Sequence, residues 1–428
     1  MTSPNTKPAG DEQMPMVRLV LAVLLPFSLC YFLSYLYRAV NAVIAPNLVA
    51  DVGLDASELG LLTAAYLIGF AGFQIPLGIL LDRFGPRKVQ ALLLCVGALG
   101  ALVFSWAAGL WGLSGARMLI GIGSAGGLMA GFKAVTIWVP EQRRALANAC
   151  IMAVGGLGIL TATVPAEWAT ANFGWRAMFV GLMAITLAVA VFLYLVVPER
   201  PKATVAAAAS ASAGSGVLDA IITIYSDRVF WRVAPFVALT AGCHIGIQTL
   251  WAGPWLRDIA GLDRDGVASV LGLQAIGFLV GTLMSGYVAD WLGRRGVSLL
   301  VTMTGFILVF MTVQLVILFE PVALSPAVWF AFGMFGQAGI LAYPWLAQYF
   351  GAELAGRSNG CLNTLVFGVA FASQYLIGAI IDLWPATDSG GYDADAYFAG
   401  FGTFLVLQVL TMVWFLLKMP KGTLRRQA

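Results

Sequence analysis

Long apolar runs alternate with short polar segments along almost the whole chain. Six runs precede an Ala-, Ser- and Gly-rich segment, and six more follow it. The runs lie at roughly 19–46, 59–81, 88–108, 110–135, 145–168, 175–197, 232–255, 266–289, 297–318, 327–350, 358–382 and 397–418. A helix needs about 20 apolar residues to cross the hydrocarbon core of a bilayer. The pattern predicts an all-α membrane protein with twelve transmembrane helices in two six-helix halves.

Composition supports this prediction and excludes other classes of protein. Only 11% of the residues are charged, against about a quarter in soluble domains. All five cysteines fall inside apolar runs, without the spacing of a disulfide framework or a metal site. The sequence also has no phosphate-binding loop and no Ser-His-Asp arrangement. We therefore expect no enzyme activity, no cofactor, no metal and no nucleic-acid partner.

The polar segments contain an internal repeat. GILLDRFGPRK begins at Gly78, and GYVADWLGRRG begins 208 positions later at Gly286. The same offset relates Asp82 to Asp290. With the low-complexity segment between the copies, the repeat divides the chain into three parts. These are an N-terminal six-helix bundle at 1–198, a cytoplasmic central linker at 199–230 and a C-terminal six-helix bundle at 231–428.

The basic residues predict an orientation. If the N-terminus is cytoplasmic, 18 of the 24 Lys and Arg residues fall on the cytoplasmic side, and only Arg176, Arg257 and Arg264 fall outside. Basic loop residues favour the cytoplasmic face. We expect a multi-pass protein of the bacterial inner membrane with both termini in the cytoplasm.

Two six-helix halves with this repeated loop resemble the major facilitator superfamily. RMLIGIGSAGG, which begins at Arg117, and GWRAMF, which begins at Gly174, resemble further motifs of that family. The resemblance implies a monomeric transporter that works by alternating access. It also implies that Asp82 contacts helix 11 and latches the outward-facing state, although the neighbouring Arg residues could serve only to set the topology. The implied gating and conformational residues are Gly78, Asp82, Arg83, Arg87, Asp290, Arg294 and Arg117.

Arg38 is the strongest candidate for substrate binding, because a basic residue inside the membrane is costly. The segment YFLSYLYRAVNAVIAPNL around it resembles helix 1 of the organic-anion symporter branch of the family. In that branch the Arg faces the central cavity and meets the substrate anion. A guanidinium can bind a carboxylate through two parallel hydrogen bonds. The alternative is that Arg38 pairs with backbone carbonyls or with another helix.

The other candidates each have a structural alternative. Lys133 could instead extend its ammonium to the membrane surface. His244, Gln248 and Trp251 share a predicted stripe on helix 7, which could equally be a packing seam. The complete predicted set of substrate-binding residues is Arg38, Tyr66, Gln74, Lys133, His244, Gln248, Trp251, Tyr343 and Asn363.

The acidic residues set the expected charge of the substrate. Of 21 Asp and Glu residues, only Glu167 and Asp382 come near a span, and none lies in mid-membrane. A net positive interior favours anions. Proton-coupled members of the resembled branch carry a carboxylate on helix 4, at the position matched here by Ser124. Coupling by Glu167, by His244 or by the substrate's own proton therefore stays open, as does uncoupled transport.

Together these features predict secondary active uptake of a small organic anion, a carboxylate-type metabolite, across the inner membrane. The partners are then the substrate, the lipid bilayer and, in symport, a proton. One rival is an exporter of a neutral or amphipathic compound. The other is a transporter-like sensor that signals without net flux.

Overall fold

The computed structural model describes residues 16–199, 217–319, 322–351, 354–387 and 391–417. All regular secondary structure in these residues is helical. Ten helices are long and apolar enough to span a membrane, or eleven when the bent pair α9 and α10 counts as one. The predicted span at 59–81 is divided at Phe73 into two shorter helices. The all-α membrane fold is confirmed, and the count of twelve spans stays a prediction.

The helices before residue 200 are called here the N-terminal half. Within it, α6 packs on α7 and α11, α4 packs on α7, and α2 packs on α9. The elements are α1 (Met16–Leu19), the π-helix η1 (Val20–Leu24), α2 (Leu25–Ala39), α3 (Asn41–Val52), α4 (Ala56–Gly72), α5 (Gln74–Phe84), α6 (Pro86–Trp106), α7 (Leu110–Ser124), α8 (Gly127–Trp138), α9 (Glu141–Thr161), α10 (Val164–Phe173) and α11 (Trp175–Val196).

The helices after residue 216 are called the C-terminal half. Here α16 packs on α18, and α14 packs on α20. The elements are α13 (Val217–Ser226), α14 (Phe230–Gly246), the π-helix η2 (Ile247–Trp251), α15 (Ala252–Asp258), α16 (Arg264–Gly293), α17 (Leu299–Leu318), η3 (Val322–Leu324), α18 (Ser325–Gly336), η4 (Gln337–Leu341), α19 (Ala342–Phe350), α20 (Ala355–Ile381) and α21 (Ala394–Leu417). The helix α13 lies inside the segment predicted as a linker.

Local sequence explains where several helices begin. Asp55 accepts a hydrogen bond from the Glu58 amide, and the Glu58 side chain accepts one from the Asp55 amide, which forms a capping box at the start of α4. Gly85 has φ +81° between α5 and α6, and Gly174 has φ +80° between α10 and α11. These left-handed conformations favour glycine and permit the tight reversals between neighbouring spans.

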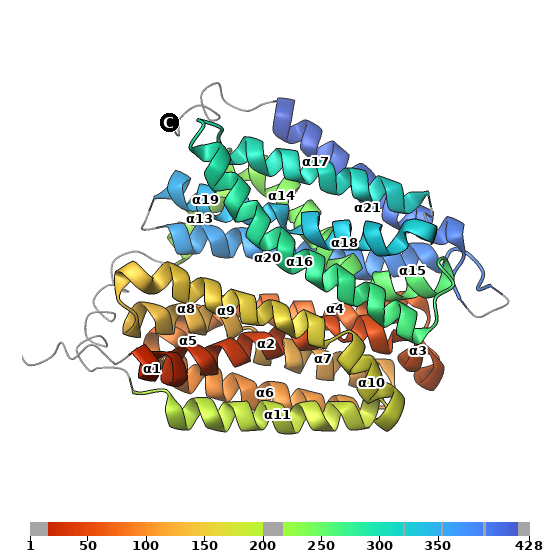
Figure 1. Ribbon diagram of the computed structural model, residues 1–428, viewed down its shortest axis with the longest axis horizontal. Helices are drawn as coiled ribbons and strands as arrows, with labels where there is room; N and C mark the ends of the chain where they lie inside the picture. The colour runs from red at the N-terminus through yellow and green to blue at the C-terminus, as the bar shows by residue number, and fades with distance from the viewer. Residues whose placement is uncertain (1–15, 200–216, 320–321, 352–353, 388–390, 418–428) are drawn as a thin grey trace, which may run out of the picture.

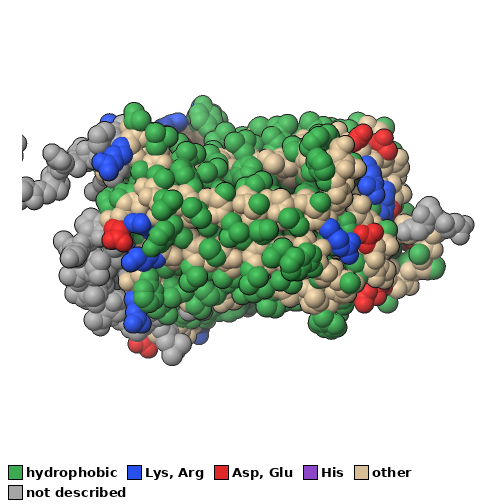
Figure 2. All heavy atoms as spheres, turned by 90° about the horizontal axis from the view of Figure 1, so that it is seen from below, with side chains coloured by type: hydrophobic (Ala, Val, Ile, Leu, Met, Phe, Trp, Pro, Cys, Tyr) green, Lys and Arg blue, Asp and Glu red, His purple; other side chains and the backbone are tan. Residues whose placement is uncertain are grey.

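The face seen in Figure 2 is a broad apolar band with charged residues at both ends. Leu195 and Leu283 are 72% and 75% exposed on this band, as lipid-facing side chains would be. One end carries Arg83, Arg87 and Arg294, where α5 and α16 finish. It is called here the basic end, and it lies on the left in Figure 1. The opposite end carries α3, α10 and α15.

The two halves meet along α4 and α20, which run antiparallel. Glycines permit the close approach, because a Cβ at Gly60 would collide with the backbone oxygen of Gln374. A Cβ at Gly378 or Gly253 would likewise collide with a backbone oxygen of the N-terminal half. Further contacts join α3 to α15 and α16 to α10 at the opposite end. In the described residues, α5 and α8 form no comparable contact with the C-terminal half near the basic end.

Candidate functional site

The guanidinium of Arg38 lies at the junction of the two halves and is surrounded by aromatic rings. The Cζ atom is 4.8 Å from the ring centre of Tyr35, 5.9 Å from that of Tyr66 and 4.9 Å from that of Phe70. A fourth ring, that of Phe367 at 5.1 Å, comes from α20 of the other half. Arg38 is only 7% exposed. Each half therefore supplies part of the enclosure.

This guanidinium has unused hydrogen-bonding capacity. Its Nε atom is buried and has no hydrogen-bond partner within the described part of the chain. The ion pairs found among the described residues lie at the two ends of the bundle, and none includes Arg38. Contact with aromatic faces stabilises a desolvated cation by about 2 kcal/mol per interaction, whereas burying an ion costs several kcal/mol. The rings hold the charge without neutralising it, which leaves a positive centre suited to an anion.

Arg117 has a different role, although it shares a ring with Arg38. Its Cζ is 5.1 Å from the Tyr66 ring centre, and the side chain is fully buried. One guanidinium nitrogen donates to the Tyr37 backbone oxygen at 2.7 Å. The Tyr66 hydroxyl donates to the Ser34 backbone oxygen at 3.0 Å. Arg117 thus joins α7 to α2 inside the N-terminal half, which is a positioning contact.

Gln74 bonds to backbone beside the enclosure around Arg38, at the break between α4 and α5. The Gln74 amide nitrogen donates to the backbone oxygens of Phe70 and Ala125, both at 3.3 Å. It therefore links the break between α4 and α5 to the break between α7 and α8. Lys133 is half-buried on α8.

Tyr343 and Asn363 lie on the C-terminal side of the junction. The Tyr343 hydroxyl donates to Asn363 Oδ1 at 3.0 Å, which joins α19 to α20. Asn363 precedes Phe367 by four residues, so both occupy one face of α20. The Tyr343–Asn363 bond thus attaches α19 to the helix that carries Phe367. These two residues therefore extend the Arg38 enclosure with polar groups.

His244 is packed inside the C-terminal half. Its ring centre is 6.5 Å from that of Phe278, 5.6 Å from that of Phe310 and 5.2 Å from that of Phe332. The ring is fully buried, and its Nδ1 lies 3.4 Å from the Gln337 amide nitrogen. Phe278, whose ring is also 5.8 Å from that of Tyr35, connects it to the junction.

The rest of the predicted helix 7 stripe is interrupted by the π-helix η2. Trp251 is fully buried, and its indole nitrogen donates to the Gln374 backbone oxygen at 3.0 Å. Gln248 is 6% exposed, and its amide nitrogen has no partner among the described residues. A π-helical turn contains more residues than an α-helical turn, so the regular spacing on which the stripe was predicted does not hold here.

In the described part of the first repeat copy, Arg83 and Arg87 contact residues of their own half. A Cβ at Gly78 would meet none of the described atoms within 4 Å, so the packing in this conformation does not require a glycine there. Arg87 donates to the Tyr194 backbone oxygen at 2.8 Å and lies 3.9 Å from Glu199. Arg83 lies over the neighbouring Phe84 ring. The side chain of Asp82 falls outside the described part of the structure.

The second repeat copy is exposed to solvent. Asp290 and Arg294 both lie on the surface at the basic end. The Arg294 backbone amide donates to the Asp290 backbone oxygen at 3.1 Å, as the end of a helix requires. In this conformation, the two residues form no described contact between the halves.

Among the described residues, the shortest polar contacts between the halves lie at the opposite end, and no sequence motif indicated them. Asp382, at the end of α20, accepts hydrogen bonds from the backbone amides of Ala56 at 3.0 Å and Ser57 at 2.7 Å. Those amides are the first of α4, so a carboxylate from one half caps a helix of the other. Glu167 also lies 3.9 Å from Arg264 across the halves.

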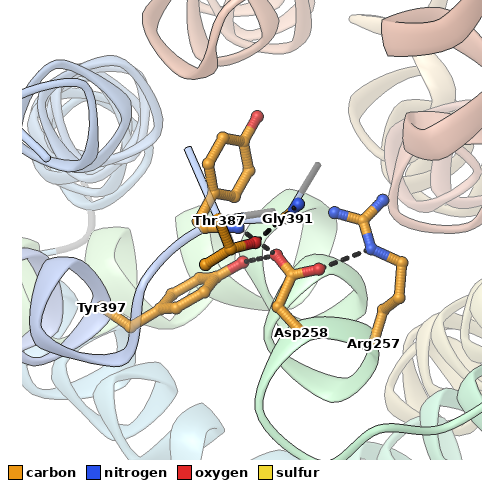
Figure 3. A network of polar contacts seen from close by, with 6 residues as sticks. Arg257, Asp258, Thr387, Gly391 and Tyr397 are labelled. Atoms are coloured by element: carbon orange, nitrogen blue, oxygen red, sulfur yellow. Dashed lines mark hydrogen bonds and ion pairs between the residues drawn. The ribbon is translucent and has the colours of Figure 1, made fainter. Parts of the chain in front are cut away.

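A second carboxylate at this end, that of Asp258, stabilises the C-terminal half (Figure 3). It accepts hydrogen bonds from Arg257 Nε at 2.6 Å, from the Tyr397 hydroxyl at 2.8 Å and from the Tyr392 amide at 3.1 Å. Burial raises the pKa of the Tyr392 phenol above its usual value. Sequence reasoning missed Asp258, because two of its three partners, Tyr392 and Tyr397, follow more than 130 positions later.

The cavities indicate which end is closed. A crevice of about 30 Å³ lies between the halves at the opposite end, lined by Pro46, Glu167, Gly253 and Arg264 among others. A space of this size holds only a few water molecules. A larger cavity of about 420 Å³ is lined by apolar residues of α2, α9, α10 and α11, with none of the predicted site residues. Its apolar lining makes it unsuitable for an anion.

Comparison with known proteins identifies the family. A sequence model of the Major Facilitator Superfamily matches residues 27–374. The chain belongs to the major facilitator superfamily. A solved structure of a D-xylose–proton symporter shares this fold, with a TM-score of 0.73 at 16% identity over 96% of this chain and 99% of that one.

Curated relatives of this major facilitator protein are mostly named as transporters of organic acids. A probable sulfoacetate transporter of Cupriavidus necator is 25% identical over 87% of this chain and 88% of its own. A probable galactarate/D-glucarate transporter of Bacillus subtilis is 25% identical over 86% of each chain. A membrane sensor protein of Escherichia coli is 23% identical over 91% of each chain. The protein is a membrane transport protein by family and is not an enzyme.

Proposed function

We propose that this protein moves a small organic anion across the bacterial inner membrane by alternating access, with Arg38 as the anion ligand. The observation that carries the proposal is the buried guanidinium with a free Nε at the junction of the halves. An anion there would gain charge-assisted hydrogen bonds, which are about twice as strong as neutral ones. Tyr343 and Asn363 would orient the remainder of the substrate.

The conformation fits a transport cycle. With a cytoplasmic N-terminus, the basic end faces the cytoplasm and the end closed by Asp382 faces outward. The structure then corresponds to an inward-facing state, in which a substrate taken up from outside would be released. The outward-facing state would require Asp382 to leave the start of α4 and the halves to close at the basic end.

Thermal stabilisation of the purified protein tests the proposal. Sulfoacetate, D-glucarate, a hexuronate, neutral sugars and a cationic drug would be compared, because a ligand at one hundred times its Kd adds about 2.7 kcal/mol to the folded state. We expect one or more of the anions to raise the unfolding temperature of wild type but not of Arg38→Ala. Arg38→Lys keeps the charge but loses the bidentate geometry, so it should lose about 1.5–3 kcal/mol of binding. Arg295→Ala, on the exposed basic end, serves as the control and should respond like wild type.

Stabilisation by neutral or cationic compounds that persists in Arg38→Ala would contradict the anion site. It would instead support an exporter of neutral or amphipathic compounds. A sensor is the second candidate, since one relative is named a membrane sensor protein. Binding of an anion without flux into proteoliposomes would favour the sensor.

A further inference from the structure

We infer that a layer of buried amide side chains keeps the opposite end of this transporter from locking shut. The layer consists of Asn41 from the N-terminal half and of Gln248 and Gln374 from the C-terminal half, and it is called here the amide layer. Its members are positioning residues for the transport cycle, because they act on the balance between conformations. The inference rests on alternating access and is independent of which substrate is carried.

Gln374 places the layer at the contact between α4 and α20. It lies about two helical turns from Phe367 on one side and from Asp382 on the other, so the three side chains share one face of α20. Phe367 contacts Arg38, and Asp382 caps α4, so this face is turned toward the N-terminal half. The backbone oxygen of Gln374 also lies against Gly60 of α4.

Asn41 and Gln248 lie at the neighbouring contact, between α3 and η2. Asn41 is the first residue of α3, which packs on η2 and α15 of the other half, and Gln248 belongs to η2. A Cβ at Gly253 of α15 would collide with the backbone oxygen of Ala42, so the two backbones are close here as well. The amide layer therefore spans both halves where they are pressed together.

Each amide has one buried polar atom that forms no hydrogen bond with the described residues. The amide nitrogen of Asn41 donates to Thr63 at 3.1 Å, and that of Gln374 donates to Thr249 at 2.7 Å. The oxygens of these two amides and the nitrogen of Gln248 have no partner. Rotating an amide by half a turn exchanges its oxygen and nitrogen, but one of the two atoms stays unbonded. Asn41, Gln374 and Gln248 are only 0%, 1% and 6% exposed.

Closing the opposite end therefore has an unfavourable part as well as a favourable one. When the halves separate there, bulk water can bond to the three amides. When the halves close, the amides leave bulk water and gain no protein partner for these atoms, which is costly. The Asp382 cap acts in the opposite direction, because it joins the two halves. The two contributions offset each other, so that neither conformation excludes the other.

Apolar replacements of similar volume test the inference. Gln374→Met and Asn41→Leu each remove one unbonded atom. The reporter is Val43→Cys, which lines the crevice at the opposite end, in a background without the five native cysteines. We expect its reaction with a maleimide in the purified protein to slow about tenfold in each variant, a typical effect of one unsatisfied buried group. The unfolding temperature should rise in both, and adding Asp382→Ala should return the labelling rate toward that of wild type.

Gln408→Met is the matched control. Gln408 is also a buried glutamine of the C-terminal half, but its amide exchanges two hydrogen bonds with that of Gln314, at 2.9 and 3.0 Å. Its loss should lower the unfolding temperature and leave the reactivity of Val43→Cys unchanged. A purely structural role for the amide layer predicts this same result for Gln374→Met, so the direction of the two readouts separates the two roles.

Three outcomes would overturn the inference. Unchanged or faster labelling in both Gln374→Met and Asn41→Leu would show that the amides do not oppose closure. Failure of both variants to fold would show that the amides stabilise the closed protein. Slower labelling that Asp382→Ala does not reverse would mean that the layer and the cap do not offset each other. Anion binding at Arg38 enters none of these measurements, so the proposed function is decided separately by its own experiment.

Discussion

At the scale of single residues, the site depends on one aromatic side chain, Tyr66, that contacts two buried cations. The Tyr66 ring lies beside both Arg38 and Arg117, while its hydroxyl bonds to Ser34. The Tyr66 ring therefore contacts the two guanidinium groups, and the Tyr66 hydroxyl separately links α4 to α2. Substitutions at this position can distinguish the two contributions.

We expect Tyr66→Phe to lower stability by about 1 kcal/mol, the typical net value of one hydrogen bond, with anion affinity nearly unchanged. Tyr66→Leu should in addition weaken anion binding, because it removes the aromatic face that holds Arg38 in place. Thermal unfolding with and without sulfoacetate measures both effects. Equal anion affinity in Tyr66→Leu and wild type would show that the ring does not position Arg38.

Arg38 could be found from the sequence, whereas its surroundings could not. A single Arg in a long apolar run is conspicuous because of its cost in a membrane. Its partners are ordinary aromatic residues in a chain that is 12% aromatic, and Phe367 follows 329 positions later. Likewise, the sequence could not separate a substrate contact from a packing contact for His244, since both require a helix face toward the bundle interior.

At the scale of helices, the pairing of α4 with α20 controls closure of the opposite end. Asp382 caps the first amides of α4, and close backbone contacts at Gly60 and Gly378 continue the pairing. Sequence patterns predicted both helices but not this contact, because a cap is normally supplied by the residue just before a helix. The break at Phe73 and the π-helix η2 could not be predicted either. The hydropathy of a segment stays the same when its helix breaks or when one of its turns takes an extra residue.

We expect Asp382→Ala to shift the population toward opening at this end by about tenfold, since a charged cap contributes on the order of 1–2 kcal/mol. The reporter is Val43→Cys, which lines the small crevice, in a background without the five native cysteines. Its reaction with a membrane-impermeant maleimide should accelerate in Asp382→Ala.

Asp263→Ala provides the matched control for this experiment. Asp263 also caps a helix, α16. It accepts a hydrogen bond from the Gly266 amide, which lies in the same half of the protein. Its loss should leave the reactivity of Val43→Cys unchanged. Similar acceleration in both variants would mean that general loosening, and not the cap between the halves, exposes the crevice.

At the scale of the whole molecule, the charge distribution and the contacts between the halves both distinguish the two ends of the helix bundle. Hydropathy and the internal repeat were sufficient to predict the all-α membrane fold, because lipid leaves the backbone few alternatives to helices. The helix α13 was not predicted, since the low-complexity segment before it dominated the interpretation of residues 199–230. Which end faces the cytoplasm rests on the basic residues alone.

Two single cysteines test this orientation. Arg264→Cys lies at the opposite end and Arg294→Cys at the basic end, and both positions are exposed. In intact cells, an impermeant thiol reagent should label Arg264→Cys at once and Arg294→Cys only after the membrane is permeabilised. The reverse pattern would place the termini outside the cell.

The crevice at the closed end also bears on the insulation of the membrane. A chain of hydrogen-bonded waters across a protein would conduct protons and dissipate the gradient that drives cellular energy conversion. The crevice of about 30 Å³ has room for only a few waters, which is a short part of such a chain. Arg257 and Arg264 line it, and each lies beside a carboxylate, that of Asp258 or Glu167. The opposite end therefore admits little water in this conformation.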